Sequence, residues 1–371
     1  MRFVFYTHSL VSDWNHGNAH FLRGLMRVLT SKGCSCLALE PEDSWSRTNL
    51  EKAHGRGYAA RFGQAFPTLS SQQYGAGFDH RAALDGADVV MVHEWTDPEL
   101  IAEIGRIRKE GGTFTLLFHD THHRAVSAER QIADLMLENY DGILAFGETL
   151  RQRYLDAGRG RQVFTFHEAA DVDLFHPLPL IERQRDLVWI GNWGDGERTA
   201  ELEEFLIAPA RELGLTGTVH GVRYPDRAID LLAQAGLDYQ GWLPNAEVPR
   251  VFANHRFTVH VPRRPYVQAL PGIPTIRVFE ALACGIPLIS APWRDEENLF
   301  RPGEDFLFAR NGEEVRAHMR DLLADPERGR ALAQCGLETI RNRHTCAHRV
   351  DQLFDIVRQL DGNGAATRGA A

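Results

Sequence analysis

The sequence predicts an α/β protein of two domains, each with a parallel sheet covered by helices. Short apolar segments of strand length alternate with amphipathic segments of helical length along most of the chain. This alternation stops at a proline-containing, charged stretch around residues 177–186 and then starts again. A length of 371 residues is also typical of about two domains.

The composition argues against several classes of protein. With 43% hydrophobic and 25% charged residues, the chain lies in the ordinary range of globular proteins. A net charge of −9 argues against a nucleic-acid-binding surface, because such surfaces are usually basic. No run of about 18 uncharged apolar residues occurs, so we expect no transmembrane segment. A peripheral contact with an anionic membrane stays open.

The start of the chain and its cysteines predict a cytoplasmic protein. Residues 2–6 read as an apolar strand, and no signal-peptide pattern precedes them. The cysteines are odd in number and lack a repeated C-x-x-C spacing, which fits neither a disulfide framework nor a zinc site. We therefore expect reduced thiols at Cys34, Cys36, Cys284, Cys335 and Cys346.

The first half of the chain follows a strand–helix–strand pattern. A strand at 2–6, a polar loop, an amphipathic helix and a strand at 35–39 form one parallel crossover unit. The pattern resumes after residue 86, with strands expected at 87–92, 113–118, 142–146 and 163–166, and helices at 97–110 and 127–137. Residues 40–80 interrupt it and predict an irregular excursion with one short helix around 50–62. Such long loops are usually functional or mobile.

Polar residues follow two of the expected strands. His93 and Glu94 come after the strand at 87–92, and the cluster His119–His123 comes after the strand at 113–118. Open α/β sheets bind ligands outside the carboxyl ends of their strands. Three interpretations stay open for the cluster: a metal site, although it lacks the helical HExxH spacing; solvated loop histidines without a role; or a binding cleft.

The second half of the chain repeats the same pattern. A strand at 187–190 leads through the glycine-rich turn 191–196 into a helix at 197–213, and a strand follows at 216–220. Glycines at such a turn allow close backbone approach, and a helix start favours an anion. The adjacent Arg263 and Arg264 offer an anion contact or form a solvated charged loop. Further helices are expected at 312–324, 326–341 and 345–360.

The stretch from 271 to 293 reads as loop, short helix, glycine stop and buried strand. Thr275 can cap the helix start, and Gly285 stands where a left-handed residue ends a helix. Arg277 and Glu280 are three residues apart and share one helix face. They form either a weak surface ion pair or a charged pair at the mouth of a ligand cleft.

The run RVFEALACGIP, from Arg277 to Pro287, resembles the donor-binding signature of the group-1 glycosyltransferases, which have the GT-B fold. It is most similar to the CgeB-like branch. The segment at 169–177 resembles the family's interdomain crossover, and GWLP at 241–244 resembles another family segment. The resemblance covers roughly residues 85–355. It implies two Rossmann-like domains that face a cleft.

The resemblance also suggests where the domains begin and end. We expect an N-terminal, acceptor-side domain at 1–178 and a C-terminal, donor-side domain at 179–345, with the linker at residues 177–186. A helix at 346–360 is expected to cross back to the first domain, and 361–371 to be a disordered tail.

For the donor, the resemblance implies that Glu280 holds the ribose and that Arg277 is a diphosphate or structural partner. Arg198, which follows the glycine-rich turn, is a basic partner for the diphosphate, and both arginines are catalytic candidates. Further donor-binding candidates are Asn192, Gly272, Ile273, Thr275, Arg263 and Trp242. One departure concerns Gly272, which stands where many members have an earlier glutamate that touches the transferred sugar.

For the other half of the cleft, His119 matches a family histidine near the donor sugar and is the third catalytic candidate. Asn18 lies in the first loop, which faces the cleft in GT-B enzymes. His93, Glu94 and His122 are further acceptor or cleft candidates, and residues 40–80 are expected to contact the acceptor.

The sequence therefore predicts a hexosyltransferase-type enzyme. It would transfer a sugar from a nucleotide-diphosphate sugar, its co-substrate, to a hydroxyl of a glycan or small molecule. We expect retention of configuration, with neither a metal nor another cofactor. Two alternatives stay open: a nucleotide-sugar epimerase of the same fold, for which Glu94 and His119 would supply acid and base, and a catalytically weak nucleotide-sugar-binding subunit, suggested by Gly272.

Overall fold

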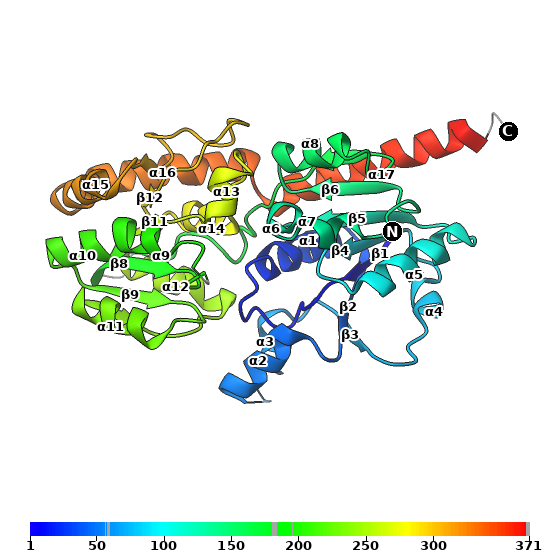
Figure 1. Cartoon of the computed structure of the whole chain (residues 1–371), viewed down its shortest axis with the longest axis horizontal. Coiled ribbons are helices and arrows are strands. Elements are labelled where there is room, and N and C mark those ends of the chain that lie inside the picture. The colour runs from blue at the N-terminus through cyan, green and yellow to red at the C-terminus, as the bar shows by residue number, and fades with distance from the viewer. Residues whose placement is uncertain (56, 58–59, 180–183, 195, 369–371) are drawn as a thin grey trace. The chain divides into compact units, whose positions relative to one another are not determined.

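The computed structural model describes residues 1–55, 57, 60–179, 184–194 and 196–368 (Figure 1). The chain divides into two compact units. Unit 1 comprises residues 1–168 and the C-terminal segment from Cys346, and unit 2 comprises Ala169–Thr345. Each unit contains one parallel sheet with helices packed on it, so the predicted α/β class is confirmed.

Within the described part of unit 1, seven strands form one parallel sheet in the order β3-β2-β1-β4-β5-β6-β7. The strands are β1 (Arg2–Tyr6), β2 (Ser35–Pro41), β3 (Ser71–Tyr74), β4 (Val89–His93), β5 (Thr115–Asp120), β6 (Gly142–Ala145) and β7 (Val163–Thr165). The helices are α1 (Ala19–Ser31), α2 (Trp45–His54), α3 (Ala60–Ala65), α4 (His80–Leu84), α5 (Pro98–Lys109), α6 (Arg124–Ser127), α7 (Glu129–Ala133), α8 (Glu148–Asp156) and α17 (Cys346–Arg368).

The segment 40–80 is more regular than the sequence predicts. It contains α2, α3 and the edge strand β3, whose pairing with β2 extends from Ala38 opposite Ser71 to Pro41 opposite Tyr74. The helix expected at 50–62 begins earlier, at Trp45. Residues 56, 58 and 59 of the expected range lie outside the described residues. β3 is polar, with the sequence SQQY, because an edge strand need not bury both faces, and the apolar pattern therefore misses it.

The expected helix at 127–137 is also wrong, because α6 and α7 are two short helices. α6 ends at Ser127, whose hydroxyl lies 2.8 Å from His123 Nδ1, and Ala128 between the helices has an extended φ of −141°. This local hydrogen bond competes with a continuous helix.

Within the described part of unit 2, six strands form a second parallel sheet in the order β10-β9-β8-β11-β12-β13. The strands are β8 (Arg185–Ile190), β9 (Gly217–His220), β10 (Leu237–Tyr239), β11 (His255–His260), β12 (Leu288–Ser290) and β13 (Leu307–Phe308). The helices are α9 (Thr199–Leu202), the π-helix η2 (Glu203–Ile207), α10 (Ala208–Leu213), α11 (Asp226–Gln234), the 3-10 helix η3 (Asn245–Glu247), α12 (Val248–Ala253), α13 (Arg264–Gln268), α14 (Ile276–Ala283), α15 (Gly312–Ala324) and α16 (Pro326–Arg343).

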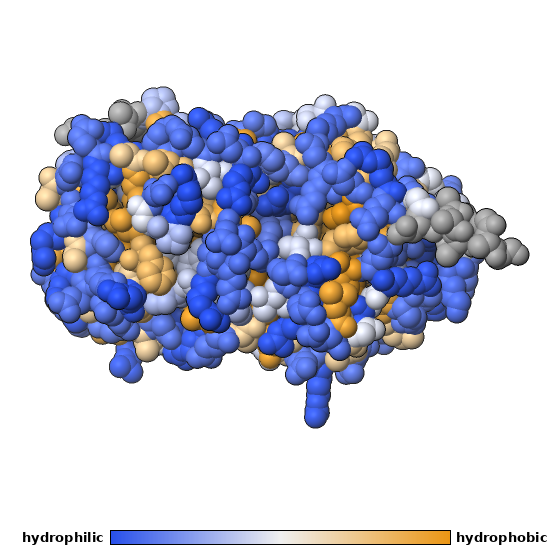
Figure 2. All heavy atoms as spheres, turned by 90° about the horizontal axis from the view of Figure 1, so that it is seen from above, coloured by the Kyte–Doolittle hydropathy of each residue, from blue (hydrophilic) through white to orange (hydrophobic). Residues whose placement is uncertain are grey.

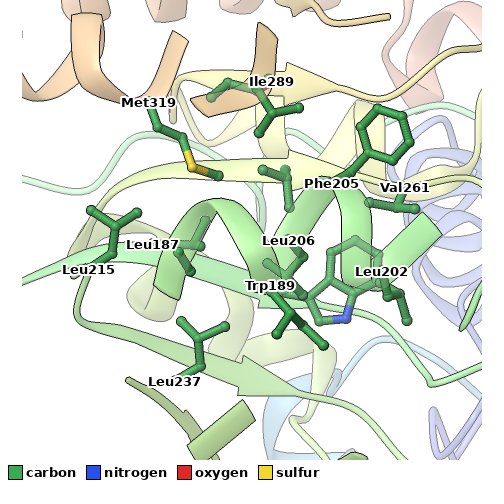
Figure 3. Packing of buried hydrophobic residues seen from close by; sticks show 14 of the residues in the cluster. Leu187, Trp189, Leu202, Phe205, Leu206, Leu215, Leu237, Val261, Ile289 and Met319 are labelled. Atoms are coloured by element: carbon green, nitrogen blue, oxygen red, sulfur yellow. The ribbon is translucent and has the colours of Figure 1, made fainter. Parts of the chain in front are cut away.

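The core of unit 2 packs the apolar side chains of β8 against η2 (Figure 3). Trp189 is 2% exposed and Leu206 1% exposed, and both belong to one buried cluster with Met319 of α15. The helix expected at 197–213 is interrupted by η2. Pro209 explains this, since it has no N–H with which to continue the regular helical ladder.

The division between the units falls about ten residues before the predicted boundary at 178. Ala170 forms a bridge with Thr345, and its N–H donates to the His344 carbonyl at 2.9 Å, which ties this segment to unit 2. Of the predicted linker, residues 180–183, which include Glu182, lie outside the described residues.

The C-terminal helix α17 packs against α1 and contacts β5 within unit 1. It continues past residue 360 to Arg368, so the tail expected at 361–371 is helical as far as it is described. The Thr115 hydroxyl donates to Asp361 at 3.2 Å, which ties this part of the helix to β5.

The surface has no continuous apolar band on the face shown in Figure 2, where hydrophilic residues separate the apolar patches. Among the helices that the structure describes, none combines the length and apolar character needed to cross a membrane.

The close approach of two turns in unit 2 predicts an intolerant glycine. A Cβ on Gly221, whose φ is +152°, would lie 2.1 Å from the Gly191 carbonyl oxygen. We expect Gly221→Ala to lower the free energy of unfolding by about 2 kcal/mol more than Gly214→Ala. Gly214 is a matched control, because its φ is also positive (+61°) and its Cβ would meet nothing within 4 Å. Equal losses for the two variants in urea unfolding would contradict the clash.

Candidate functional site

The carboxyl edge of the sheet in unit 2 has a topological switch point between β8 and β11. β9 and β10 lie on one side of this point and β12 and β13 on the other. The loops that follow β8 and β11 therefore diverge from it, and open α/β sheets bind ligands at such a place.

Arg198 lies at this switch point and is buried. Its guanidinium donates to the Asn192 carbonyl after β8 at 2.5 Å and to the Val261 carbonyl after β11 at 3.0 Å. The remaining Nε is buried and has no hydrogen-bond partner in the part of the chain that the structure describes. Burial, then the nearby Arg263, lowers the pKa of Arg198 to about 9, so the side chain is still charged at neutral pH.

The turn after β8 is braced against the turn after β9. Asn192 Oδ1 accepts from the Val222 N–H at 2.9 Å, so this side chain holds the two loops together. The Tyr224 hydroxyl donates to the Gly191 carbonyl at 2.7 Å and accepts from Trp189 Nε1 at 2.8 Å. The backbone that presents Arg198 is therefore fixed by several hydrogen bonds. Asp195, within the predicted glycine-rich turn, lies outside the described residues.

Arg277 and Glu280 of α14 are hydrogen-bonded to each other as the spacing predicts. The pair is not at the surface, however, since the Glu280 side chain is 0% exposed and that of Arg277 17% exposed. The interpretation as a surface ion pair is wrong for this reason. Glu280 faces inward because α14 is buried around most of its circumference.

Thr275 precedes α14 at the N-cap position but does not cap the helix with its side chain. Its hydroxyl lies 3.1 Å from Nε2 of the buried His260, at the end of β11. The other ring nitrogen of His260 lies 3.0 Å from the Ser290 hydroxyl. Burial, with Arg198 and Arg277 nearby, lowers the pKa of His260 to about 3, so it is a neutral brace between β11, β12 and α14.

The loop before α14 makes a Pro271-Gly272 turn in which Gly272 has a φ of +87°. A glutamate would be strained at this φ, so the glycine follows from the turn. Ile273 is 2% exposed, so its side chain is buried. Only the backbone of these two residues is suited to contact a ligand.

The remaining donor candidates have protein partners or a loop position. Arg263 donates to Glu197 at 2.9 Å, and Arg264 binds both oxygens of Glu201, at 2.6 and 3.0 Å. The adjacent arginines are thus each neutralised by a carboxylate. Trp242 is half-buried in the loop after β10.

Unit 1 has its own switch point, between β1 and β4. A small hollow lies there, lined in part by Thr7, His16, Asn18, His93 and His119. The His93 ring lies 5.9 Å from those of His8 and His119, and the rings of His8 and His16 lie 3.8 Å apart. Burial lowers the pKa of His8 to about 4 and that of His119 to about 3, so these rings are neutral at pH 7.

Hydrogen bonds fix part of this histidine cluster. His93 Nε2 lies 2.9 Å from the Thr121 hydroxyl, which also accepts from the Asn18 side chain. His119 Nε2 is buried without a hydrogen-bond partner among the described residues. The interpretation as solvated loop histidines is therefore wrong for His93 and His119, which are 7% and 6% exposed.

Two buried carboxyl groups lie beside this cluster. Glu94 has a fully buried side chain and accepts from Arg124 at 3.0 Å. Burial, then Asp120, raises the pKa of Glu94. Asp120 accepts from the Tyr154 hydroxyl at 2.7 Å, and burial raises its pKa to about 6. His122 is half-buried, and its N–H donates to Asp120 at 3.2 Å.

The described residues hold no group of three or more His, Cys, Asp or Glu side chains placed to bind a metal ion. Several functional candidates were not predicted from the sequence, namely His8, His16, Arg124 and His260. His8 and His16 lie in the loop after β1 and His260 ends β11. The rule that ligands bind at strand ends could therefore have found these three.

Part of the chain matches a protein family in sequence. Residues 198–355, which contain Arg198, Arg277 and Glu280, match a family model described as "Glycosyl transferase-like". A comparison with curated proteins finds no match.

The structure is similar to solved glycosyltransferases along nearly its whole length. Sucrose-phosphate synthase from Thermosynechococcus elongatus aligns with a TM-score of 0.68 at 14% identity, covering 98% of this chain and 100% of that one. The chain has the GT-B glycosyltransferase fold. Anabaena HepE in complex with UDP and glucose aligns over 97% of this chain and 100% of its own, with a TM-score of 0.67 at 13% identity. An alpha-glucosyltransferase in complex with UDP and a 13-mer DNA aligns over 96% and 99%, with a TM-score of 0.69 at 12% identity.

These likenesses establish the predicted GT-B fold, and the family model identifies residues 198–355 as a glycosyltransferase-like segment. The CgeB-like branch stays a prediction, as do the roles of the individual site residues in this GT-B protein. The arrangement in unit 2 can hold an anion beside a buried guanidinium, and that in unit 1 can hold uncharged polar groups.

The burial of Glu280 predicts a structural cost when it is removed. Glu280→Ala leaves Arg277 without this carboxylate in a mostly buried position, and breaking a buried pair costs about 3–5 kcal/mol. We expect the thermal midpoint to fall by roughly 6 °C or more. The midpoint of Glu280→Gln should fall less, because glutamine keeps a hydrogen bond. Glu304 pairs with Arg301 at the same spacing but is 64% exposed, so Glu304→Ala is the control. An equal effect of the two alanine variants would contradict the buried pair.

The buried histidines predict loss of stability in mild acid. Their pKa values in the folded protein lie below 6.5, so the unfolded chain takes up protons first as the pH falls. Each such histidine then lowers the free energy of unfolding by up to about 1.4 kcal/mol per pH unit. Glu94 and Asp120 act oppositely, because their raised pKa values let the folded protein bind protons first, but they are fewer.

We therefore expect a lower thermal midpoint at pH 5.0 than at pH 7.5. His16→Gln should reduce this difference, whereas the exposed His176→Gln should leave it unchanged. An equal or higher midpoint at pH 5.0 for the unmodified protein would show that these histidines are not held neutral.

Proposed function

We propose that this protein transfers a sugar from a nucleotide-diphosphate sugar to an acceptor hydroxyl. The observation that carries this proposal is the buried guanidinium of Arg198 at the switch point of unit 2, held by two backbone carbonyls. A diphosphate is the anion that a nucleotide sugar would bring there.

The charges around Arg198 favour a bound anion. Arg263 is paired with Glu197 and Arg277 with Glu280, so each of these positive charges is offset. Arg198 contacts carbonyl oxygens instead, and removing a charge from water costs several kcal/mol. A phosphate oxygen beside Nε would offset this cost through a charge-assisted hydrogen bond.

The same charge would act in catalysis. As the bond between the anomeric carbon and the diphosphate breaks, the departing oxygen takes the electron pair and gains negative charge. A guanidinium that is already in place stabilises this charge more than it stabilises the bound donor. Arg198, Arg277 and the backbone around 192 and 272–275 are our candidates for this role. Since the Arg198 guanidinium and the backbone N–H groups would offset the charge of the diphosphate, we propose that no metal and no other cofactor takes part.

We propose that the acceptor hydroxyl attacks from the side that the diphosphate leaves, which retains the configuration. The hydroxyl oxygen bonds to the anomeric carbon, and its proton passes to the leaving phosphate oxygen. His119 is neutral at pH 7, so we assign it a hydrogen bond to a sugar hydroxyl rather than a proton transfer. Glu280 would bind the ribose only if its carboxylate became accessible, because its side chain is fully buried.

A uridine nucleotide is the first donor to test. The solved structures of Anabaena HepE and of the alpha-glucosyltransferase contain UDP. We also propose a cytoplasmic location, since all five cysteines, each within the described residues, are free.

A second candidate is a nucleotide-sugar-binding subunit without turnover. It is favoured by Gly272, whose positive φ disfavours the glutamate that would touch the transferred sugar. Release of free nucleotide diphosphate in the presence of an acceptor separates the two candidates. The epimerase alternative needs an available acid–base pair, whereas Glu94 is ion-paired with Arg124.

The test measures thermal unfolding with UDP, GDP, ADP, CDP and their sugars. A ligand at a hundred times its dissociation constant adds about 2.7 kcal/mol, so one nucleotide should raise the midpoint by a few degrees. We expect Arg198→Met to weaken the binding of that nucleotide by roughly 10- to 100-fold. Arg211→Met, at a half-exposed guanidinium of α10, is the matched control. The absence of any shift in the unmodified protein, or equal binding by Arg198→Met, would refute the proposed donor site.

A further inference from the structure

Trp95 is a large apolar side chain that is both exposed and held in place. It lies just beyond β4 in unit 1 and is 46% exposed. The Arg124 guanidinium carbon lies 4.3 Å from the indole centroid, and the rings of His122 and His8 meet the indole edge-on at 5.4 and 6.4 Å. Contacts on several sides thus fix the indole while much of its surface stays in water.

The support beneath Trp95 is an ion pair. Arg124 donates to the Glu94 carbonyl at 2.7 Å and to its carboxylate at 3.0 Å, and the other end of its guanidinium donates to Gln131 at 3.0 Å. The Glu94 side chain is 0% exposed and that of Arg124 13% exposed. A buried carboxylate is costly to maintain, so an arginine fixed in this way indicates that the position of the indole matters.

A second exposed tryptophan lies on the other side of β1. Trp45 begins α2, after β2, and is 50% exposed, with its ring 5.1 Å from that of Trp14. β2 and β4 are the two neighbours of β1 in the sheet. His8, in the loop after β1, connects the two sites: its carbonyl accepts from Ser44, directly before Trp45, at 2.5 Å, and its ring contacts Trp95.

We propose that Trp95 and Trp45 form a platform that binds sugar rings, and that the acceptor of the reaction is a glycan of at least two sugars. The C–H face of a pyranose ring is apolar and packs on an indole, while its hydroxyls point outward to polar groups and water. Trp95 has such polar neighbours in Arg124 and His122. A lipid tail would instead need a continuous apolar patch. The role as acceptor rests on the proposed function, but sugar binding by unit 1 does not.

The test titrates the full chain with maltose, cellobiose, lactose and diacetylchitobiose, and detects binding by saturation-transfer NMR. We expect at least one disaccharide to bind, Trp95→Ala to weaken it by roughly tenfold or more, and Trp95→Phe to keep most of the affinity. Met136→Ala, at another exposed apolar side chain of unit 1, is the control and should have no effect. The thermal shift caused by UDP should be the same in all four proteins, which also shows that the variants are folded.

Two outcomes would overturn the platform: no disaccharide binds the unmodified protein, or Trp95→Ala binds as well as the unmodified protein does. If octyl glucoside binds but the disaccharides do not, the surface accepts an alkyl chain and the proposal is wrong. Disaccharide binding without any nucleotide-induced shift would refute the proposed transferase while leaving the platform intact. A nucleotide-induced shift without disaccharide binding would refute the platform while leaving the proposed transferase intact.

Discussion

Parallel strand pairing is the constraint on which both units depend. Every neighbouring pair of strands in the two sheets is parallel, so each strand must be followed by a crossover before the next one begins. As a result, all the strand ends of a sheet meet at one edge, and the loops beyond that edge are free to carry polar residues. Arg198, Asn192 and His260 reach that edge in unit 2, and the histidine cluster reaches it in unit 1.

Those edges are also where the protein departs from the most stable arrangement. A buried arginine is held by carbonyls, and several histidines are held neutral by burial. Each of these groups would be cheaper to expose or to replace by an apolar side chain. Violations of this kind concentrate at functional sites, because function needs charge and hydrogen-bonding capacity that packing alone does not.

The sequence predicted the fold well because period and length are local signals. Every described strand of unit 1 except β3 was located, and Gly285 ends α14 with a φ of +64°, as expected of a left-handed residue. The polar edge strand β3 and the break at Pro209 were missed, since neither follows from an apolar period.

The site was harder to predict. The pairing of Arg277 with Glu280 follows from helical spacing, but their burial does not, because it depends on the elements that pack around α14. Likewise, only the folded sheets show that Thr275 contacts His260 instead of capping its helix.

The return of α17 to unit 1 makes the order of synthesis matter. Unit 2 is one continuous segment, Ala169–Thr345, and has every strand it needs once that segment has left the ribosome. Unit 1 is interrupted, because its first 168 residues must wait for the helix that begins at Cys346 to cover α1. During that interval the side of α1 that α17 covers has no permanent partner. Unit 2 can thus mature before unit 1, and a chaperone that shields exposed apolar helices would act on residues 1–168.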